Sequence, residues 1–220
     1  MIKRLVEKFL AAVAVILLSP IFLLAALGIR LSSAGPVFYC AQRMGRNQRI
    51  FTMYKFRTMH VQTRPQSAIT ATYDPRVYPF GALLRKLKID ELPQLLNILK
   101  GEMSFVGPRP EDPAIVRKHY SPLQLETLQV LPGLASPGSI YNYTHIEAQL
   151  DTAHAERSYL EKQLKLKLAL ELVYVREASL FYDARIVLRT LLVILAIALG
   201  KRRFGDPPEM EKAQLLAQGS

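Results

Sequence analysis

The chain has 220 residues, of which 29 are Lys or Arg and 18 are Asp or Glu, so its formal net charge is +11. Half of the residues are hydrophobic, which suits one domain with an apolar attachment element, and the charge predicts anionic partners: lipid headgroups, nucleotide diphosphates or nucleic acid. The single cysteine, Cys40, excludes an internal disulfide and agrees with a reducing compartment. No Cys/His cluster has zinc spacing, and there is no internal repeat.

The first long element is an apolar run from Phe9 to Ile29 that contains no charged residue. It is long enough to cross a bilayer once as a helix. A signal peptide fits less well, because the run is long for one and no clear cleavage site follows. A third interpretation is a re-entrant hairpin broken at Ser19-Pro20. An interior proline costs a helix about 3 kcal/mol, and the Ser19 hydroxyl could compensate the orphaned carbonyl of Ile16.

Length and charge both bear on this choice. Each half of the run would be roughly 15 Å long, half of a hydrocarbon core of about 30 Å. A single span favours positive charge on one side only, whereas here both flanks are basic. A hairpin would return both ends to the cytoplasmic face, so the residues leave a kinked spanning helix and a hairpin open. The flanking cations are Lys3, Arg4 and Lys8 before the run and Arg30, Arg43, Arg46 and Arg49 after it.

Two strands are predicted next, over residues 37–41 and 50–59, joined by a polar turn at 45–47. Alternation places Lys55 and Arg57 on one face of the second strand with Phe51 and Met53. These cations suit a phosphate or a lipid surface, and equally well a solvated strand edge that discourages aggregation. Residues 60–73 are polar and without period, which predicts a loop; a turn at 74–76 and a basic helix or turn at 81–88 follow.

The most informative stretch is residues 88–110, which begins with the adjacent carboxylates of Asp90 and Glu91. Leucines at helical spacing predict a short helix with Pro93 in its first turn and Gly101 at its exit. A short buried strand at 105–106 follows, and then Pro108-Arg109-Pro110 holds a guanidinium on a stiff, extended segment. Carboxylates beside a rigid arginine suggest chemistry on a phosphate. Acidic residues that merely complement a helix dipole are the competing interpretation.

The C-terminal half is less specific. The pattern predicts an amphipathic helix over 114–130, a turn-rich loop over 131–138 and a long charged helix or helix pair over 146–170. Residues 186–199 are apolar but interrupted by Arg189, so they form either a core helix or a helix lying in a membrane interface. The segment after Gly205 is polar and is expected to be disordered.

Several of these segments resemble the bacterial sugar transferases, the monotopic polyprenyl-phosphate phosphoglycosyl transferases. The resemblance rests on the Ser-Pro break, KFRTM at 55–59, DPRVYPFGALLRKLKIDELPQ at 74–94, the Pro-Arg-Pro segment, and LELVYVREASLFYD at 170–183. It implies an α+β, mostly helical monotopic membrane protein with a re-entrant helix-break-helix hairpin, a small β-hairpin and surface amphipathic helices. The expected parts are a membrane hairpin at 1–34, a catalytic domain at 35–204 and a polar tail at 205–220.

The resemblance also implies an activity: a sugar-1-phosphate passes from a UDP-sugar to undecaprenyl phosphate, with release of UMP and with Mg²⁺ as cofactor. The expected place is the cytoplasmic face of the bacterial inner membrane, in contact with its lipids. We expect Asp90 to be the nucleophile and Glu91 to assist the second half-reaction, for example by taking a proton from the lipid phosphate. Candidate substrate-binding residues are Arg109, Pro108, Arg85, Arg76, Lys55 and Arg57; candidate metal ligands are Asp90, Glu171 and Asp183; Ser19 and Pro20 break the hairpin.

Two departures from the family pattern and two rival functions stay open. Glu171 stands where the family has Asp, and the loop at 131–138 resembles a PGITSP-type branch rather than the commoner one with an arginine before Pro-Gly. The identity of the sugar and the oligomeric state are not readable. One rival is a non-catalytic, membrane-tethered scaffold of a polysaccharide export complex. The other, nucleic-acid binding, is disfavoured because no nucleic-acid motif is present and the cations flank apolar segments.

Overall fold

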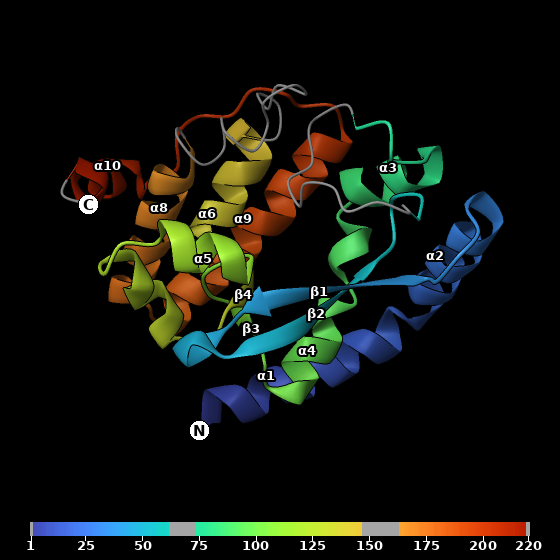
Figure 1. The fold of residues 1–220 in the computed structure, drawn as a ribbon, viewed down its shortest axis with the longest axis horizontal. Coiled ribbons are helices and arrows are strands. Elements are labelled where there is room, and N and C mark those ends of the chain that lie inside the picture. The colour runs from blue at the N-terminus through green and yellow to red at the C-terminus, as the bar shows by residue number, and fades with distance from the viewer. Residues whose placement is uncertain (1, 62–73, 147–162, 219–220) are drawn as a thin grey trace.

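The structure is a computed structural model that describes residues 2–61, 74–146 and 163–218. Helices surround two small two-stranded sheets, so the predicted α+β class with a mostly helical content is confirmed (Figure 1). Most of the loop predicted at 60–73 and much of the helix predicted at 146–170 lie outside the described residues.

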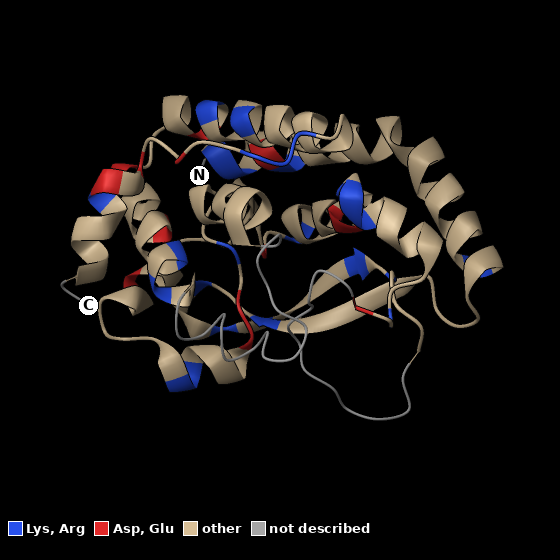
Figure 2. Ribbon diagram, turned by 90° about the horizontal axis from the view of Figure 1, so that it is seen from above, with Lys and Arg blue, Asp and Glu red and all other residues tan. Residues whose placement is uncertain are grey.

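The chain begins with two helices, α1 (Ile2–Leu17) and α2 (Ser19–Ser32), that meet at a bend of 59°. Pro20 cannot donate to the carbonyl of Ile16, and the Ser19 hydroxyl donates to that oxygen instead, at 2.8 Å. The predicted break and its local compensation are therefore confirmed. In Figure 2 charge colours only the first turns of α1 and the last turn of α2. Among the described residues, no helix on its own is both long and apolar enough to cross a bilayer. The bent pair of α1 and α2 meets both criteria only when the two helices are counted together.

One face of α1 packs on the rest of the protein. Ala11 is fully buried in a cluster that includes Leu95 and Ile98 of α4 (Gln94–Lys100). Two polar contacts fix the first turns: Lys3 Nζ lies 2.6 Å from Asp183 Oδ2, and the Ser104 hydroxyl donates to Glu7. The other faces of α1 leave large apolar side chains exposed, among them Phe9, Ile16 and Leu17. On α2, Leu23, Leu24 and Leu27 are exposed as well.

The predicted β-hairpin is present as β1 (Phe38–Met44) paired antiparallel with β2 (Ile50–Phe56). The turn between them, η1 (Arg46–Gln48), contains two non-glycine residues with positive φ, Asn47 and Gln48. The first strand is longer than predicted, and the second ends at Phe56 rather than at Met59. Because β2 ends there, the expected alternation fails, and both Phe56 and Arg57 are buried.

The central segment begins with α3 (Pro79–Lys86) and then makes a short 3₁₀ turn, η2 (Ile89–Glu91), before α4. The acid pair therefore lies in a separate turn ahead of the helix, which differs from the predicted position in its first turn. Gly101 ends α4 in the left-handed conformation with φ 80°, as predicted. The short strand β3 (Ser104–Val106) then leads into the Pro-Arg-Pro segment.

β3 pairs in parallel with β4 (Gly133–Ala135), a strand inside the stretch that was predicted to be only a turn-rich loop. A Cβ at Gly133 would lie 2.0 Å from the Gly107 nitrogen, so this crossing of two backbones requires glycine. The helix predicted over 114–130 is wrong as one element. It is split into α5 (Pro113–His119) and the 3₁₀ helix η3 (Gln124–Gln129), with Pro122 between them.

The remaining helices pack around this sheet. They are α6 (Pro137–Tyr141), the π-helical turn η4 (Asn142–Ile146), α8 (Leu164–Glu177), α9 (Leu180–Ala198) and α10 (Met210–Gln218). On α9, Ile186 is fully buried, whereas Leu188, Leu191, Leu192 and Leu195 are exposed. The expectation of disorder after Gly205 is wrong, because α10 packs on α8 and buries Ala213 against Ala169, Leu170 and Val173.

Candidate active site

Asp90 and Glu91 are buried side by side in the η2 turn, with 7% and 6% of their surface exposed. Glu91 is held from three sides. Its Oε1 accepts hydrogen bonds from Lys55 Nζ at 2.9 Å and from Arg109 Nη2 at 2.5 Å, while its Oε2 accepts from the Tyr143 hydroxyl at 3.0 Å. Asp90 differs: its Oδ1 is buried and has no hydrogen-bond partner in the part of the chain that the structure describes. That oxygen is available for a ligand or a reaction.

The electrostatic settings of the two acids are opposite. Burial would raise the pKa of Glu91, but Arg109 and Lys55 outweigh that effect and hold its pKa well below the usual value. Burial raises the pKa of Asp90, and the attraction of Lys55 offsets this only in part. Lys55 itself has a lowered pKa because burial outweighs the attraction of Glu91. Glu91 is thus a stably ionised partner of two cations, and Asp90 is the acid of the pair that has a carboxylate oxygen without a hydrogen-bond partner among the described residues.

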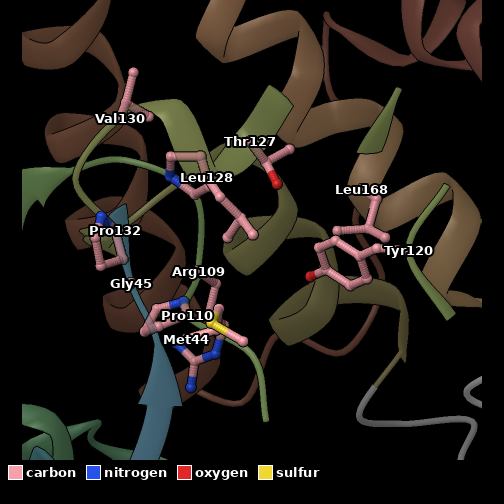
Figure 3. A pocket seen from close by; sticks show the side chains of 11 residues that line it. Met44, Gly45, Arg109, Pro110, Tyr120, Thr127, Leu128, Val130, Pro132 and Leu168 are labelled. Carbon is pink, nitrogen blue, oxygen red and sulfur yellow. The ribbon is translucent and has the colours of Figure 1, made fainter. Parts of the chain in front are cut away.

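Arg109 reaches the acid pair from the rigid Pro-Arg-Pro segment, as the sequence predicted. Its backbone is tied on the far side, because the Arg109 N–H donates to Glu171 Oε1 at 3.2 Å and the Pro108 carbonyl accepts from Gly133 N at 3.0 Å. Figure 3 shows the small cavity behind this segment, lined among others by Pro110 and by Leu168 of α8. Its volume is about 10 Å³, room for no more than one water molecule, so it supports the loop and does not take a substrate.

The structure brings only some of the predicted cations to the acid pair. Lys55 contacts Glu91 directly. Arg85 donates to Thr58 Oγ1 at 3.0 Å, and its charge is close enough to lower the pKa of Asp90. Arg76 forms an ion pair with Asp74, its neighbour two residues before.

Arg57 has a structural role at the exit of α2. Its Nη1 donates to the Ser33 hydroxyl at 2.8 Å, its Nη2 to the Ser33 carbonyl at 2.7 Å, and its Nε to the Pro36 carbonyl at 2.6 Å. It therefore links the end of β2 to the segment that leaves α2. The alternation pattern of a strand could not show this, because the strand ends one residue earlier.

The three predicted metal ligands are not brought together. Glu171 is buried behind Arg109, where its Oε1 accepts from the Ser136 hydroxyl at 2.7 Å, and burial raises its pKa to about 7. Asp183 accepts from Lys3 and, at 2.7 Å, from the Tyr174 hydroxyl, so it fastens α1 to α9. Within the described ranges no group of three or more His, Cys, Asp or Glu side chains is arranged to hold a metal ion.

Two residues of the site were not found from the sequence. The Tyr143 hydroxyl accepts from Arg109 Nη1 at 3.1 Å as well as donating to Glu91, and Lys88 Nζ lies 3.7 Å from the centre of the Tyr143 ring. Lys88 has an unusual backbone conformation, with φ 55° and ψ 20°. The position of Lys88 next to the acid pair was a weak sequence signal that it belongs to the site. Nothing in the local sequence indicated Tyr143.

The sequence profile described as bacterial sugar transferase matches residues 1–197. The chain belongs to the bacterial sugar transferase family. This confirms the resemblance found in the sequence, and it places α10 beyond the matched residues.

Curated relatives agree with this assignment. The chain is 35% identical over 198 residues to the UDP-glucose:undecaprenyl-phosphate glucose-1-phosphate transferase of Xanthomonas campestris pv. campestris, covering 88% of this chain and 38% of the relative. It is 35% identical over 197 residues to the UDP-N-acetylgalactosamine-undecaprenyl-phosphate N-acetylgalactosaminephosphotransferase of Aeromonas hydrophila, with coverage of 88% and 44%. The exopolysaccharide production protein ExoY of Rhizobium meliloti is 37% identical over 209 residues, with coverage of 87% and 84%. The chain thus spans less than half of the first two relatives and most of the third.

Proposed function

We propose that the protein transfers a sugar-1-phosphate from a UDP-sugar to undecaprenyl phosphate, as a membrane step of surface polysaccharide or glycoconjugate synthesis. Family membership and the names of relatives with this activity support the proposal. The observation that carries it is the buried Asp90, whose Oδ1 has no hydrogen-bond partner among the described residues and lies among cations. A nucleophile that must meet a diphosphate needs such a setting.

In the proposed first step, a carboxylate oxygen of Asp90 attacks the phosphorus that bears the sugar. The phosphoanhydride bond breaks, its electron pair leaves with UMP, and an aspartyl-phosphosugar intermediate remains. In the second step, a phosphate oxygen of undecaprenyl phosphate attacks the same phosphorus and the carboxylate of Asp90 leaves. Burial and the charge of Glu91 raise the pKa of Asp90, and the cations Lys55, Lys88 and Arg85 act against that shift, so a cationic setting favours the ionised carboxylate that the attack requires.

Glu91 receives a role different from the proton acceptor expected from the sequence. Its lowered pKa makes it a poor base while Arg109 and Lys55 hold it. We therefore assign to Glu91 the positioning of these two cations, which neutralise the charge that develops on the transferring phosphoryl group. Arg109, with its planar guanidinium on a stiff backbone, is the proposed phosphate contact.

We also propose that the site binds Mg²⁺, with fewer protein ligands than the three that were expected from the sequence. Mg²⁺ is commonly bound by one or two carboxylates together with substrate phosphates, and the unpartnered Oδ1 of Asp90 fits that arrangement. Asp183 does not fit it, because Lys3 and Tyr174 engage its carboxylate. Glu171 is buried behind the Arg109 backbone, where its Oε1 accepts two hydrogen bonds, although its Oε2 has no hydrogen-bond partner among the described residues. When bound, the ion would neutralise charge on the diphosphate of the donor.

The decisive experiment is the Asp90→Asn variant, assayed for UMP release from a panel of UDP-sugars in the presence of undecaprenyl phosphate and Mg²⁺. Loss of the nucleophile should lower turnover by about 1,000-fold or more and should abolish trapping of labelled sugar phosphate on the protein. A variant that keeps most of its turnover would refute the role of Asp90. If the native chain releases no UMP from any UDP-sugar, the scaffold interpretation gains support instead.

We also propose that the protein is monotopic, with the bent pair α1–α2 re-entering the cytoplasmic face of the bacterial inner membrane. The proline break, the basic residues on both flanks and the exposed apolar side chains of both helices support this topology. Reporter tags on Met1 and Ser220 should both be cytoplasmic. Pro20→Ala should straighten the pair towards a spanning helix and move the N-terminal tag to the other side; tags on opposite sides in the native chain would refute the hairpin.

A further inference from the structure

A second cavity, with none of the residues of the candidate active site in its walls, lies where α8, α9 and the start of α10 meet (Figure 1). Its volume is about 310 Å³, which falls within the range of small-ligand pockets, about 300–1,000 Å³. Pro208, Glu209 and Lys212 form one side of it, and these residues lie beyond the 197 that the family profile matches. The proposed transfer gives this cavity no role.

A buried carboxylate in the cavity wall has one unsatisfied oxygen. Glu209 is only 7% exposed, and its Oε1 accepts hydrogen bonds from the Tyr182 hydroxyl at 2.9 Å and from Arg189 Nη1 at 2.6 Å. Its Oε2 is buried and has no hydrogen-bond partner in the part of the chain that the structure describes. Buried polar atoms without a partner are rare and costly in native proteins. Because Glu209 lines the cavity, the N–H group of a ligand held there would satisfy this carboxylate.

The cavity wall carries charges of both signs. Two acids, Glu177 and Glu209, and two cations, Arg185 and Lys212, line it. Glu177 and Lys212 form an exposed ion pair at 2.5 Å. The Arg185 guanidinium carbon lies 5.1 Å from the centre of the Phe181 ring, and an arginine that contacts a ring can still bind a phosphate through the N–H groups at its edge. Such a wall suits a ligand that carries an anion and a cation close together.

One wall of the cavity continues into an apolar helix face. Phe181 lines the cavity and is 74% exposed, and helical spacing places it on the same side of α9 as the exposed Leu188, Leu192 and Leu195. The beginning of α9 is tied to the beginning of α1, the helix proposed to enter the membrane, through the ion pair of Lys3 with Asp183. A molecule with a charged head in the cavity can therefore lay an apolar chain along α9.

We propose that this cavity binds the headgroup of a phosphatidylethanolamine, a zwitterionic phospholipid with a primary ammonium, while its acyl chains lie on the exposed face of α9. The ammonium donates to Glu209, and Arg185 and Lys212 bind the phosphate. A phosphocholine headgroup carries the same charges, but its quaternary ammonium has no N–H group to donate to Glu209. The inference rests on the proposed membrane attachment and goes beyond the proposed transfer.

The test measures the binding of soluble short-chain lipids to the delipidated full-length protein in detergent, by calorimetry. Dihexanoyl phosphatidylethanolamine should bind on the order of tenfold more tightly than dihexanoyl phosphatidylcholine, because a charge-assisted hydrogen bond separates the two. Dihexanoyl phosphatidylglycerol, which has the phosphate but no ammonium, should also bind more weakly. Equal affinities for the three lipids would overturn the headgroup assignment. If glycerophosphoethanolamine, which lacks acyl chains, binds as tightly as the lipid, the assignment to a lipid is wrong.

The location of the bound lipid is tested by hydrogen exchange. The cavity joins α10 to α8 and α9, so phosphatidylethanolamine should slow amide exchange in α10, and phosphatidylcholine should slow it less. A lipid that binds without any effect on α10 lies elsewhere on the protein, and that result would overturn the proposal.

Two variants test the contacts. Arg185→Gln removes an exposed cation of the cavity and should weaken phosphatidylethanolamine binding on the order of tenfold without a loss of melting temperature. Arg176→Gln is the matched control, because Arg176 is an exposed arginine of α8 that pairs with Glu126 and does not line the cavity. It should keep the native affinity. Native affinity in Arg185→Gln as well would contradict the phosphate contact.

Glu209→Gln should remove the preference for phosphatidylethanolamine over phosphatidylcholine, and a retained preference would refute the role of Glu209. This change also weakens the ion pair with Arg189 next to α10, so Arg185→Gln, which leaves that pair intact, is measured beside it. None of these measurements uses UMP release. Their failure therefore leaves the proposed transfer standing, and a chain that selects phosphatidylethanolamine but releases no UMP contradicts only the transfer.

Discussion

Two buried glutamates, Glu91 and Glu171, bind opposite ends of the same residue. The Arg109 guanidinium donates to Glu91, and the Arg109 backbone N–H donates to Glu171. Both side chains are more than nine-tenths buried, yet the pKa of Glu91 is held well below its usual value while that of Glu171 is raised to about 7.

The difference lies in the partners. Two cations contact Glu91, whereas the nearest polar groups of Glu171 are a neutral hydroxyl and a neutral N–H. Lys167 lies on the same helix as Glu171, but its Nζ forms an ion pair with Glu111 Oε2 at 3.0 Å. Burial penalises the charged form of any carboxylate, and at Glu91 the charges and the hydrogen bond of the two cations outweigh that penalty. Glu91 therefore holds a negative charge in the site, whereas Glu171 supports the loop as a carboxyl group that is about half protonated near pH 7.

The largest effect is expected from Glu91→Gln. The change leaves Lys55 and Arg109 without their carboxylate in a buried site, and breaking such a pair costs about 3–5 kcal/mol. We expect the free energy of unfolding, measured by chemical denaturation, to fall by this amount and UMP release to be lost. Glu177→Gln is the control, because Glu177 and Lys212 form an exposed pair that contributes at most about 1 kcal/mol. Equal small effects of the two variants would contradict the ion-paired state of Glu91.

The second prediction concerns Glu171 and pH. Its pKa is 4.5 in a model peptide and about 7 in the fold, so between these values the unfolded chain binds fewer protons than the folded one. Stability from this group is therefore complete below pH 4.5 and is lost as pH rises through 7, a total of about 3 kcal/mol. Glu171→Gln should remove this part of the pH dependence, so the difference in unfolding free energy between native and variant should change across this window. Parallel curves would show that Glu171 is charged at neutral pH.

The contribution of Glu91 to stability changes with pH in the opposite direction to that of Glu171, so the pH test distinguishes the two acids. Because its folded pKa is lowered, its contribution is present above pH 4.5 and is lost only as pH falls through the folded value. The two acids thus act in different pH windows. Asp90, with a raised pKa, acts in the same direction as Glu171, and the comparison with Glu171→Gln subtracts its effect.

The surroundings of Glu91 could be predicted from the sequence better than those of Glu171, and the reason is physical. Asp90, Glu91 and Arg109 lie within 20 residues of one another, and prolines, a glycine exit and helical spacing are local signals that place them. The Ser19 hydroxyl that caps the break is likewise a local effect. Such features follow from backbone chemistry that acts over a few residues.

The rest depends on packing between distant segments. Tyr143 reaches Glu91 across 52 residues, and Glu171 reaches Arg109 across 62, through contacts that no local pattern encodes. Glu171 and Asp183 were expected to be metal ligands because residues 170–183 resemble a family run, and such a resemblance cannot tell a metal ligand from a structural hydrogen-bond acceptor. Arg57 was predicted to lie within the second strand, but the strand ends at Phe56, because the end of a strand cannot be located to one residue from alternation.

The smallest effect is expected from a change at Gly138, the glycine that faces Glu171. This change tests most directly how Glu171 is packed. A Cβ on Gly138 would lie 2.5 Å from Glu171 Oε1, so Gly138→Ala should cost about 1–3 kcal/mol through overpacking. Glu171→Asp shortens the side chain and should recover part of that cost in the double variant, while the Lys167 carbonyl, 3.0 Å from the same Cβ, limits the recovery. The measurement is a double-mutant cycle on unfolding free energies.

Gly205→Ala is the control for that cycle, since no atom of the described residues lies within 4 Å of its Cβ position. It should leave stability nearly unchanged and should show no coupling to Glu171→Asp. Strict additivity of Gly138→Ala and Glu171→Asp would mean that the carboxylate does not press on this glycine. In that case the size of the Glu171 side chain would not explain why this position is a glycine.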